Sequence, residues 1–236
     1  MSSAAATSGS TNQWAAVQKL PAFRWPRGGR IVVVSPHPDD ETLGAGGLIA
    51  MATQRLLEVV VISVTNGEAA YVQDNLAAVR RQELGHALRC LSLPRTIGHH
   101  YLGLPDGRLH ETEEELDRAL QKLLKPTDLV VCTLEDDGHD DHAACARATI
   151  RTAHRIGATV RCFPVWSWLG DRTTTSPILK GERLNLSLPA QARKRRAIAT
   201  FTSQIESPHE IVPQSLIDQV NRGVEIFVDP GLLQCG

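Results

Sequence analysis

The sequence predicts an α/β protein with a Rossmann-like, mostly parallel β-sheet and helices on both of its faces. Two observations predict this fold. Short runs of β-branched apolar residues, such as Ile31–Val34, are typical of strands that are buried on both faces of a parallel sheet. These runs alternate with helical patterns through the first two-thirds of the chain, as right-handed βαβ units require.

The expected strands are apolar runs that turn residues bound on either side. Glu58–Thr65 has the same β-branched character as the first run, and Asn66-Gly67 closes it with a turn. In chain order, strands are expected at residues 31–34, 58–65, 99–104, 129–133, 159–163 and 224–228.

The expected helices are segments in which apolar residues recur at helical spacing. Thr112 and Glu115 are expected to form a capping box at the start of one of them. Glycines 44, 46 and 47 are expected to allow a close approach near the start of another. In chain order, helices are expected at residues 14–20, 42–55, 75–91, 112–124, 141–155, 188–205 and 215–221.

Length and charge limit the class of protein. The 236 residues fit one large domain. We expect an N-terminal tail and short helix at residues 1–26 and a single domain at 27–236, whose last part, from about residue 165, helps to form the substrate pocket. The formal net charge is −1, so no basic excess favours a nucleic-acid partner. The oligomeric state is left open.

The cysteine pattern and the absence of long apolar segments indicate a cytoplasmic protein. The five cysteines are an odd number, and no two have C-x-x-C spacing, which favours reduced thiols. No stretch approaches the roughly 18–20 apolar residues of a membrane span. Residues 1–13 are rich in Ser, Ala and Thr and lack the features of a signal peptide.

Two polar clusters point to chemistry. His37–Glu41 directly follows the strand expected at 31–34, and Glu135–His142 follows the strand expected at 129–133. Ligands collect beyond the carboxyl ends of strands in such sheets, so the two clusters meet if these strands are neighbours. His and Asp side chains are ligands for Zn²⁺, which in catalytic sites takes three protein ligands and leaves a position for water.

Spacing narrows the choice of ligands without settling it. His37 and Asp40 flank Pro38, and a turn of that length can direct both side chains to one point while Asp39 points elsewhere. His142 falls on the first turn of a helix. Each acidic residue alone is read as a helix cap, because carboxylates accept backbone N–H bonds there. Two His/Asp clusters between a strand and a helix favour a metal site instead.

Several motifs resemble those of one enzyme family. Ser35-Pro36-His37-Pro38-Asp39-Asp40-Glu41 resembles the (A/S)-H-P-D-D-E segment of the PIG-L/LmbE-like zinc deacetylases, and His139–His142 is similar to their later H-x-D-H segment. Order and spacing fit from about residue 30 to 150. Weaker similarities are found at Thr65–Glu68 (T-x-G-E), Arg80–Glu83 (R-x-x-E), Leu102–Gly107 (G-L-P-D-G) and Ser203-Gln204 (SQ).

The resemblance implies a Rossmann-like fold and zinc-dependent removal of an N-acyl group from an N-acetylglucosamine-type amine. It implies Zn²⁺, or another divalent metal such as Fe²⁺, held by His37, Asp40 and His142. Asp39 is implied as the general base that takes a proton from the metal-bound water. His139 is implied as the charged group that stabilises the oxyanion or protonates the amine, and Asp141 as the residue that holds His139 in position.

The expected partner is a small amino-sugar conjugate. Arg80 is expected either to contact this substrate or to be a solvated helix residue, and Asp106 either to bind substrate or to form the Pro-Asp-Gly turn. Of Trp166 and Trp168, one is expected in the core while the other stacks on a sugar ring. The basic run 193–196 is expected to be a solvated helix face.

Two other functions compete with deacetylation. An amidase that acts on a thiol-sugar or another N-acyl conjugate needs the same residues. A non-catalytic sugar- or nucleotide-binding protein is the other alternative, because Gly44-Ala45-Gly46-Gly47 is superficially similar to a phosphate-binding loop. That segment lacks G-x-G-x-x-G spacing, and the carboxylates before it repel a pyrophosphate.

Overall fold

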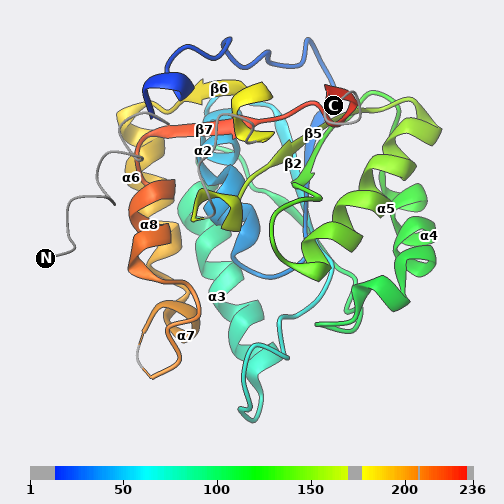
Figure 1. Cartoon of the computed structure of the whole chain (residues 1–236), viewed down its shortest axis with the longest axis vertical. Helices are drawn as coiled ribbons and strands as arrows, with labels where there is room; N and C mark the ends of the chain where they lie inside the picture. Colours follow the sequence, from blue (N-terminus) through cyan, green and yellow to red (C-terminus); the bar gives the residue numbers. More distant parts are fainter. Residues whose placement is uncertain (1–13, 170–176, 207, 233–236) are drawn as a thin grey trace, which may run out of the picture.

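A five-stranded sheet forms the centre of the molecule, and each neighbouring pair of its strands is parallel. The computed structural model describes residues 14–169, 177–206 and 208–232 (Figure 1). In the order of the sheet, the strands are β3 (Gly98–Tyr101), β2 (Glu58–Ser63), β1 (Arg30–Ser35), β4 (Leu129–Thr133) and β5 (Thr159–Phe163). The expected parallel sheet is confirmed.

Helices cover both faces of this sheet, as expected (Figure 1). The central strands are apolar on both sides, and residues 31–34 are fully buried, because each face packs against a helical layer. One face carries α2 (Asp40–Gln54), α3 (Leu76–Leu91) and α6 (Leu188–Ile198), which pack on one another. The other face carries α4 (Glu113–Leu123) and α5 (Asp140–Ile156).

The chain changes direction in the sheet between β1 and β4. It runs outward from β1 through β2 to β3 and then returns to β4, on the other side of β1. The register pairs Val34 with Cys132, so the two strands end side by side. The polar clusters that follow these strands therefore lie at a topological switch point, where ligands bind in open α/β sheets.

The C-terminal part adds elements that the sequence predicts incompletely. β6 (Glu182–Asn185) pairs antiparallel with β7 (Val224–Phe227), and β6 is not among the expected strands. The helix expected at 188–205 is two helices, α6 and α7 (Thr202–Ile205), because Phe201 turns into the core between them. A further helix, α8 (Gln214–Val220), follows, and residues 14–17 are helical within the segment expected at 14–20. Short 3-10 turns lie at Leu109–Glu111, Trp166–Trp168, Pro177–Lys180 and Pro230–Leu232.

Two local expectations are wrong. Thr112 makes no capping bond to the start of α4, because the 3-10 turn before the helix places its hydroxyl on the Leu109 carbonyl instead. The basic run 193–196 is not uniformly solvated. Arg195 and Arg196 are exposed, but the side chain of Lys194 is only 1% exposed and pairs with Glu225.

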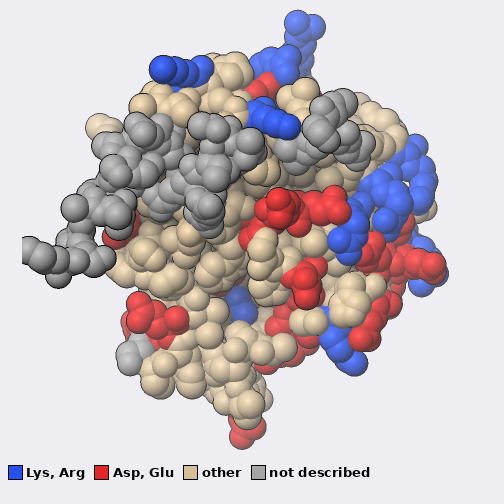
Figure 2. Space-filling model, viewed as in Figure 1, with Lys and Arg blue, Asp and Glu red and all other residues tan. Residues whose placement is uncertain are grey.

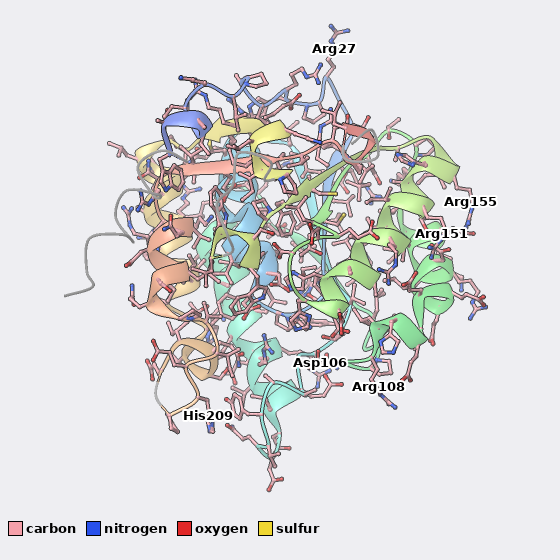
Figure 3. The ribbon with its side chains drawn as sticks, viewed as in Figure 1. Arg27, Asp106, Arg108, Arg151, Arg155 and His209 are labelled. Atoms are coloured by element: carbon pink, nitrogen blue, oxygen red, sulfur yellow. The ribbon has the colours of Figure 1, made fainter. Side chains whose placement is uncertain are left out.

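The outer surface over α4 and α5 is a mixture of charges (Figure 2). Arg151 and Arg155 project from α5 on this side (Figure 3), and Arg151 Nε lies 2.8 Å from Asp117 Oδ2 on α4. Such partly exposed pairs contribute little to stability, so α4 is held mainly by its buried leucines.

Two further expectations concern membrane spans and thiols. No helix in the described ranges is long and apolar enough to cross a membrane. Cys90, Cys132, Cys145 and Cys162 are free thiols. Cys235 and the expected tail at residues 1–13 lie outside the described residues, and the division of the chain into domains stays a prediction.

The glycines of α2 allow the close approach that their spacing predicts. A Cβ added to Gly44 would overlap the ring of Phe163 on β5. Gly44 thus lets the first turns of α2 lie directly on the sheet, and these are the turns that follow His37–Glu41.

Replacement of Gly44 by alanine is therefore expected to destabilise the protein by about 1–3 kcal/mol, since the added methyl overpacks the core. Gly85→Ala is the matched control, because its Cβ would meet only the flexible Arg89 side chain on α3. Gly85→Ala should stabilise the protein by about 0.5–1 kcal/mol. Denaturant unfolding of both variants measures the difference; equal stabilities would contradict the packing argument.

Candidate metal and active site

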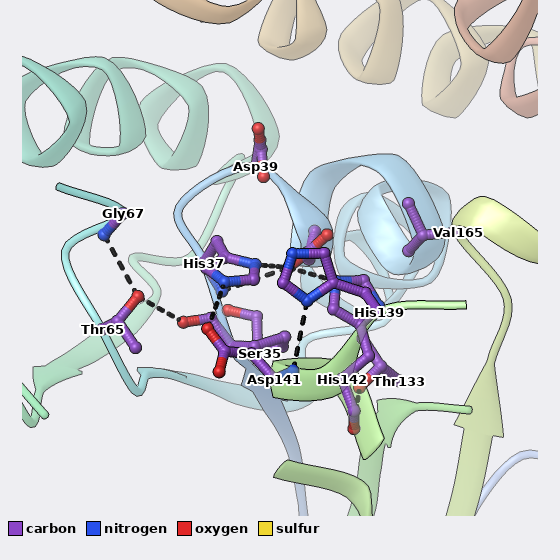
Figure 4. A network of polar contacts seen from close by, with 12 residues as sticks. Ser35, His37, Asp39, Thr65, Gly67, Thr133, His139, Asp141, His142 and Val165 are labelled. Atoms are coloured by element: carbon purple, nitrogen blue, oxygen red, sulfur yellow. Dashed lines mark hydrogen bonds and ion pairs between the residues drawn. The ribbon is translucent and has the colours of Figure 1, made fainter. Parts of the chain in front are cut away.

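The loop between β1 and α2 directs two side chains to one point. His37 Nδ1 lies 3.0 Å from Asp40 Oδ2, and the His37 backbone N–H donates to the same oxygen at 3.1 Å. Asp39 has a φ of 139° and a ψ of −33°, a strained conformation for a residue other than glycine. Figure 4 shows the Asp39 side chain apart from the His37 ring.

The start of α5, directly after the loop that follows β4, supplies a second imidazole. His142 lies on the first turn of α5 and is fully buried. Its Nε2 is 3.3 Å from Asp40 Oδ2, and its ring centroid is 5.5 Å from that of His37. The structure therefore brings together His37, Asp40 and His142, the three ligands that the resemblance implies, with ligand atoms within 4.8 Å of one another.

The donor set fits a divalent metal ion. The Nδ1 of His142 is bonded to Asp137 Oδ2 at 2.7 Å, which leaves the Nε2 lone pair free to coordinate. This Nε2 is buried, and it has no hydrogen-bond partner among the described residues despite its proximity to Asp40. A buried polar atom without a partner is costly, so its orientation towards His37 and Asp40 favours an ion there. Two imidazoles and a carboxylate are a typical catalytic Zn²⁺ set.

A second possible group consists of His37, His139 and Asp141. The Asp141 carboxylate already accepts the backbone N–H groups of Gly107, at 2.7 Å, and Leu109, at 3.0 Å. His139 is exposed. The set with His142 is better suited, because all three residues are buried and it contains the Nε2 atom for which the described residues offer no hydrogen-bond partner.

The charges of His37, Asp40 and His142 strongly affect one another's pKa values. Burial alone would lower the pKa of His142, but the carboxylates of Asp40 and Asp137 outweigh it and raise that pKa to about 9. Burial would raise the pKa of Asp40, but the two imidazoles hold it well below its ordinary value. The raised pKa values of His37 and His142 favour protonated rings in the metal-free cluster, and metal binding would require their deprotonation.

Asp39 pairs with Arg80 and lines the same cavity as His37 and Asp40. Arg80 is buried on α3 and donates to Asp39 Oδ2 at 3.1 Å and to the carbonyls of Pro38 and Gly67, both at 2.9 Å. It is therefore not a solvated helix residue. Burial raises the pKa of Asp39 to about 7, although the Arg80 charge opposes the rise. A carboxyl group that titrates near neutral pH suits proton transfer.

Glu41 supports the backbone turn at Asp39. Its buried carboxylate accepts the Asp39 backbone N–H at 3.2 Å and the Ser35 hydroxyl at 3.3 Å. Burial raises the pKa of Glu41 to about 7. Glu41 thus holds the backbone of the loop, as a cap or support.

Asp106 and Asp141 orient His37. The Nε2 of His37 lies 3.1 Å from a carboxylate oxygen of each. Asp106 also accepts the Ala69 backbone N–H at 2.6 Å, so it is more than a turn former. Burial would raise the pKa of Asp141, but His37 and the backbone N–H donors lower it to about 2.

His139 has a defined tautomer. Asp141 does contact His139, but through its backbone N–H, which donates to His139 Nδ1 at 3.2 Å (Figure 4). Partial burial and the neighbouring His37 lower the pKa of His139, which favours the neutral ring over the charged one that the resemblance implies. A neutral ring whose Nδ1 accepts a hydrogen bond carries its own hydrogen on Nε2.

A cavity of about 290 Å³ opens at this site. One part of it is lined by His37, Asp39, Asp40, Arg80, Asp106, His139 and Asp141, whereas the fully buried His142 is not among the lining residues. The C-terminal half supplies a wall of Trp166, Gln204, Ile211 and Val212. Figure 2 shows a hollow on the viewed face with acidic side chains beside it, and Figure 3 places Asp106 in the lower half of that face.

The two tryptophans have separate environments. Trp168 is buried and stacks on Trp14 with ring centroids 5.2 Å apart, whereas Trp166 lines the cavity. His209 does not line it, and its ring stacks on Tyr71 at 3.9 Å.

Residues 32–153, more than half of the chain, match the PIG-L family, which is described as GlcNAc-PI de-N-acetylase. The chain belongs to the PIG-L family. Within the matched range lie both polar clusters and each of the metal-ligand candidates described above. The family thus agrees with the expectation drawn from the motifs.

Individual relatives match only part of their own length. A probable N-acetyl-alpha-D-glucosaminyl L-malate deacetylase 2 of Bacillus subtilis is 31% identical over 137 residues, which cover 53% of this chain and 61% of that protein. A mycothiol S-conjugate amidase of Streptomyces coelicolor is 26% identical over 151 residues, which cover 51% of this chain and 50% of that protein. The chain thus spans about half to three-fifths of these two relatives.

A solved structure confirms the fold. The structure of the A40926 pseudoaglycone deacetylase Dbv21 has a TM-score of 0.68 and 21% identity, with 85% of this chain and 96% of that chain covered. At this identity the likeness supports the architecture of the PIG-L protein and says nothing about its substrate.

Sequence reasoning assigned no role to two residues of the PIG-L site. Asp137 accepts the backbone N–H groups of residues 165–167 as well as the His142 ring, so it anchors that ligand to the C-terminal wall. Its position five residues before His142 was the available signal. Gln204 lines the cavity, and only the weak SQ match pointed to it.

Replacement of Asp137 by asparagine is expected to weaken metal binding about 10–100-fold, because the amide no longer fixes the His142 ring as a carboxylate does. Titration of metal-free protein with Zn²⁺ measures the affinity. Asp136→Asn is the matched control, since that neighbouring side chain is exposed, and it should bind like wild type. Equal affinities of the two variants would contradict the role of Asp137.

Proposed function

We propose that this protein is a metal-dependent hydrolase that removes the N-acetyl or another N-acyl group from an N-acetylglucosamine-type amino-sugar conjugate. One observation carries the proposal. The buried Nε2 of His142, which has no hydrogen-bond partner in the part of the chain that the structure describes, converges with His37 and Asp40 beside a carboxyl group whose pKa is about 7. The names of the relatives, which describe deacetylation of glucosaminyl compounds, support the substrate class.

His37, Asp40 and His142 would hold the ion, Zn²⁺ or another divalent metal such as Fe²⁺. When bound, such an ion polarises a carbonyl oxygen and lowers the pKa of water towards 7. Asp137 and the Asp106–Asp141 pair fix the two imidazole rings in ligating orientations. The protein thereby supplies a preformed set of ligands.

Asp39 is the proton carrier in this proposal. Its ionised carboxylate accepts a proton from the attacking water, and the protonated form then donates it to the departing amine nitrogen. Burial would keep the group protonated at neutral pH, whereas Arg80 holds a positive charge 3.1 Å away and favours the ionised form. The two effects together place the pKa where both steps are accessible.

His139 is the oxyanion stabiliser. The neutral ring carries its hydrogen on Nε2, because Nδ1 accepts the Asp141 backbone N–H. An N–H donor that lines the cavity can stabilise the negative charge that develops on the acyl oxygen. This role needs no charged imidazole, so the lowered pKa of His139 is compatible with it.

The cavity suits one sugar residue with its acyl group. Trp166 offers an aromatic face for a pyranose ring, and Arg80 and Asp106 remain the proposed polar contacts. The expected amidase activity on a thiol-sugar conjugate is the second candidate, because the similarity to a mycothiol S-conjugate amidase favours it and the same residues serve it. We keep the cytoplasmic location expected from the cysteine pattern as part of the proposal.

The proposal is tested by metal analysis together with amine release from a panel of N-acetylated sugars and thiol-sugar conjugates. Stoichiometric metal and amine release from at least one glucosaminyl compound is the expected result. A purified protein that binds no divalent metal and releases no amine from any compound would overturn it.

Asp39→Ala should lower kcat about 100- to 10,000-fold while the metal is retained, because the ligand set remains and the proton carrier is lost. Steady-state kinetics and metal content of the purified variant are the measurements. Asp140→Ala removes an exposed carboxylate from the start of α5 and should keep wild-type kinetics. Turnover near wild type in Asp39→Ala would exclude its role as the base.

Arg80→Met should move the acidic limb of the kcat/KM pH profile to higher pH. The Arg80 charge lowers the pKa of Asp39, so its removal raises that pKa, and the ionised base then forms only at higher pH. Arg108→Met removes an exposed arginine next to the cavity residue Gly107 and should leave the profile unchanged. An unshifted limb in Arg80→Met would show that another group controls it.

A further inference from the structure

A buried ion pair lies against α2, and neither of its members lines the cavity. Lys194 of α6 and Glu225 of β7 are 1% and 2% exposed, and Lys194 Nζ lies 2.7 Å from Glu225 Oε1. Neither residue takes part in the proposed chemistry. A buried pair of charges costs desolvation energy and is often no more stabilising than an apolar pair. The hydrogen-bond partners of Lys194 and Glu225 therefore indicate the role of the ion pair.

Both members of the pair bind the backbone of α2. Glu225 accepts the N–H groups of Gly47, at 2.6 Å, and Leu48, at 2.7 Å. Lys194 Nζ donates to the carbonyl of Leu43 at 2.7 Å. In a regular α-helix the Gly47 N–H and the Leu43 carbonyl are partners of each other. The ion pair thus engages both ends of one helical turn inside α2.

The glycine-rich segment of α2 makes this contact possible. A Cβ on Gly47 would lie 2.9 Å from Glu225 Oε1, and a Cβ on Gly46 would lie 3.3 Å from Lys194 Cγ. Larger residues at these positions would push the ion pair away from the helix. The glycines that are superficially similar to a phosphate-binding loop therefore serve the approach of Lys194 and Glu225.

The turn that the pair holds is connected directly to Asp39. The Leu43 carbonyl accepts from Lys194, while the Leu43 N–H donates to the Asp39 carbonyl at 2.8 Å. Asp39 has the strained backbone of the site, with a φ of 139°. Such a conformation persists only where its surroundings over-determine it. Leu43 therefore connects the ion pair to Asp39, through its carbonyl on one side and its N–H on the other.

We propose that Lys194 and Glu225 are positioning residues that clamp the second turn of α2, so that Asp39 and Asp40 keep the geometry required for catalysis and metal binding. This inference rests on the proposed function. The C-terminal elements α6 and β7 thereby determine how the ligands on the N-terminal loop are presented.

The decisive experiment replaces both charges at once. Lys194→Met/Glu225→Met removes the ion pair while it retains apolar volume, and such replacements of buried pairs are often tolerated. The metal-free variant is titrated with Zn²⁺ after its folding has been checked by thermal unfolding. We expect about 10–100-fold weaker Zn²⁺ binding, the range for residues that support metal ligands.

The Arg30–Asp128 pair offers a matched control. It is also largely buried, and it also binds backbone groups, since Arg30 donates to the Leu123 carbonyl and Asp128 accepts the Lys125 N–H. It lies at the amino ends of β1 and β4, opposite the metal-ligand candidates. Arg30→Met/Asp128→Leu should bind Zn²⁺ like wild type. Wild-type affinity in folded Lys194→Met/Glu225→Met would overturn the proposal.

A milder variant decides the question if the double variant does not fold. Glu225→Gln has nearly the same shape and keeps one carbonyl acceptor for two backbone N–H groups. Amide hydrogen exchange of the metal-free protein should become faster at Leu43 and Leu48 but not at Val33 in the sheet. Unchanged exchange at Leu43 and Leu48 would contradict the clamp.

These measurements separate the clamp from the function. Hydrogen exchange and Zn²⁺ titration need no substrate, so a wild-type protein that binds Zn²⁺ and releases no amine would refute the function alone. A wild-type protein that hydrolyses N-acetylated sugars, together with a double variant that binds Zn²⁺ normally, would refute the clamp alone.

Discussion

The parallel pairing of β1 with β4 is the constraint on which the rest of the site depends. The register that places Val34 beside Cys132 ends the two strands together, so the loops that follow them share one volume. His37 and Asp40 come from the segment that joins β1 to α2, and His142 from the start of α5 after β4, yet their ligand atoms lie within 4.8 Å. Burial of these charged groups is costly, and they are tolerated because each compensates another or, as proposed, binds a metal.

Further carboxylates hold the metal-ligand candidates and the turn at Asp39 in place. Asp137, Asp141 and Glu41 each accept backbone N–H groups while they face an imidazole or the strained turn at Asp39. A carboxylate held by several backbone donors cannot rotate freely, so the rings that it contacts are held as well. The polar groups of this site are organised before any substrate arrives, which is the arrangement that electrostatic stabilisation requires.

The C-terminal part of the chain contributes both to the wall of the cavity and to the support of α2. Trp166, Gln204 and Val212 form a wall of the cavity. Lys194 and Glu225 bind the backbone of α2, which connects distant parts of the chain to the turn that carries Asp39. The sequence predicted that this part helps to form the pocket, but the residues responsible follow no periodic pattern that identifies them in advance.

The sequence by itself determined the parallel sheet, the order of most helices and the candidates His37, Asp39, Asp40 and His142, because strand periodicity and short motifs depend on neighbouring residues. Only the tertiary structure decided the features that depend on contacts between residues far apart in the sequence. It separated Trp166 from Trp168, buried Lys194 in a run that resembles a solvated helix face, and showed Arg80 bonded to Asp39. It also favoured a neutral His139, since a pKa depends on every charge nearby and not on sequence spacing.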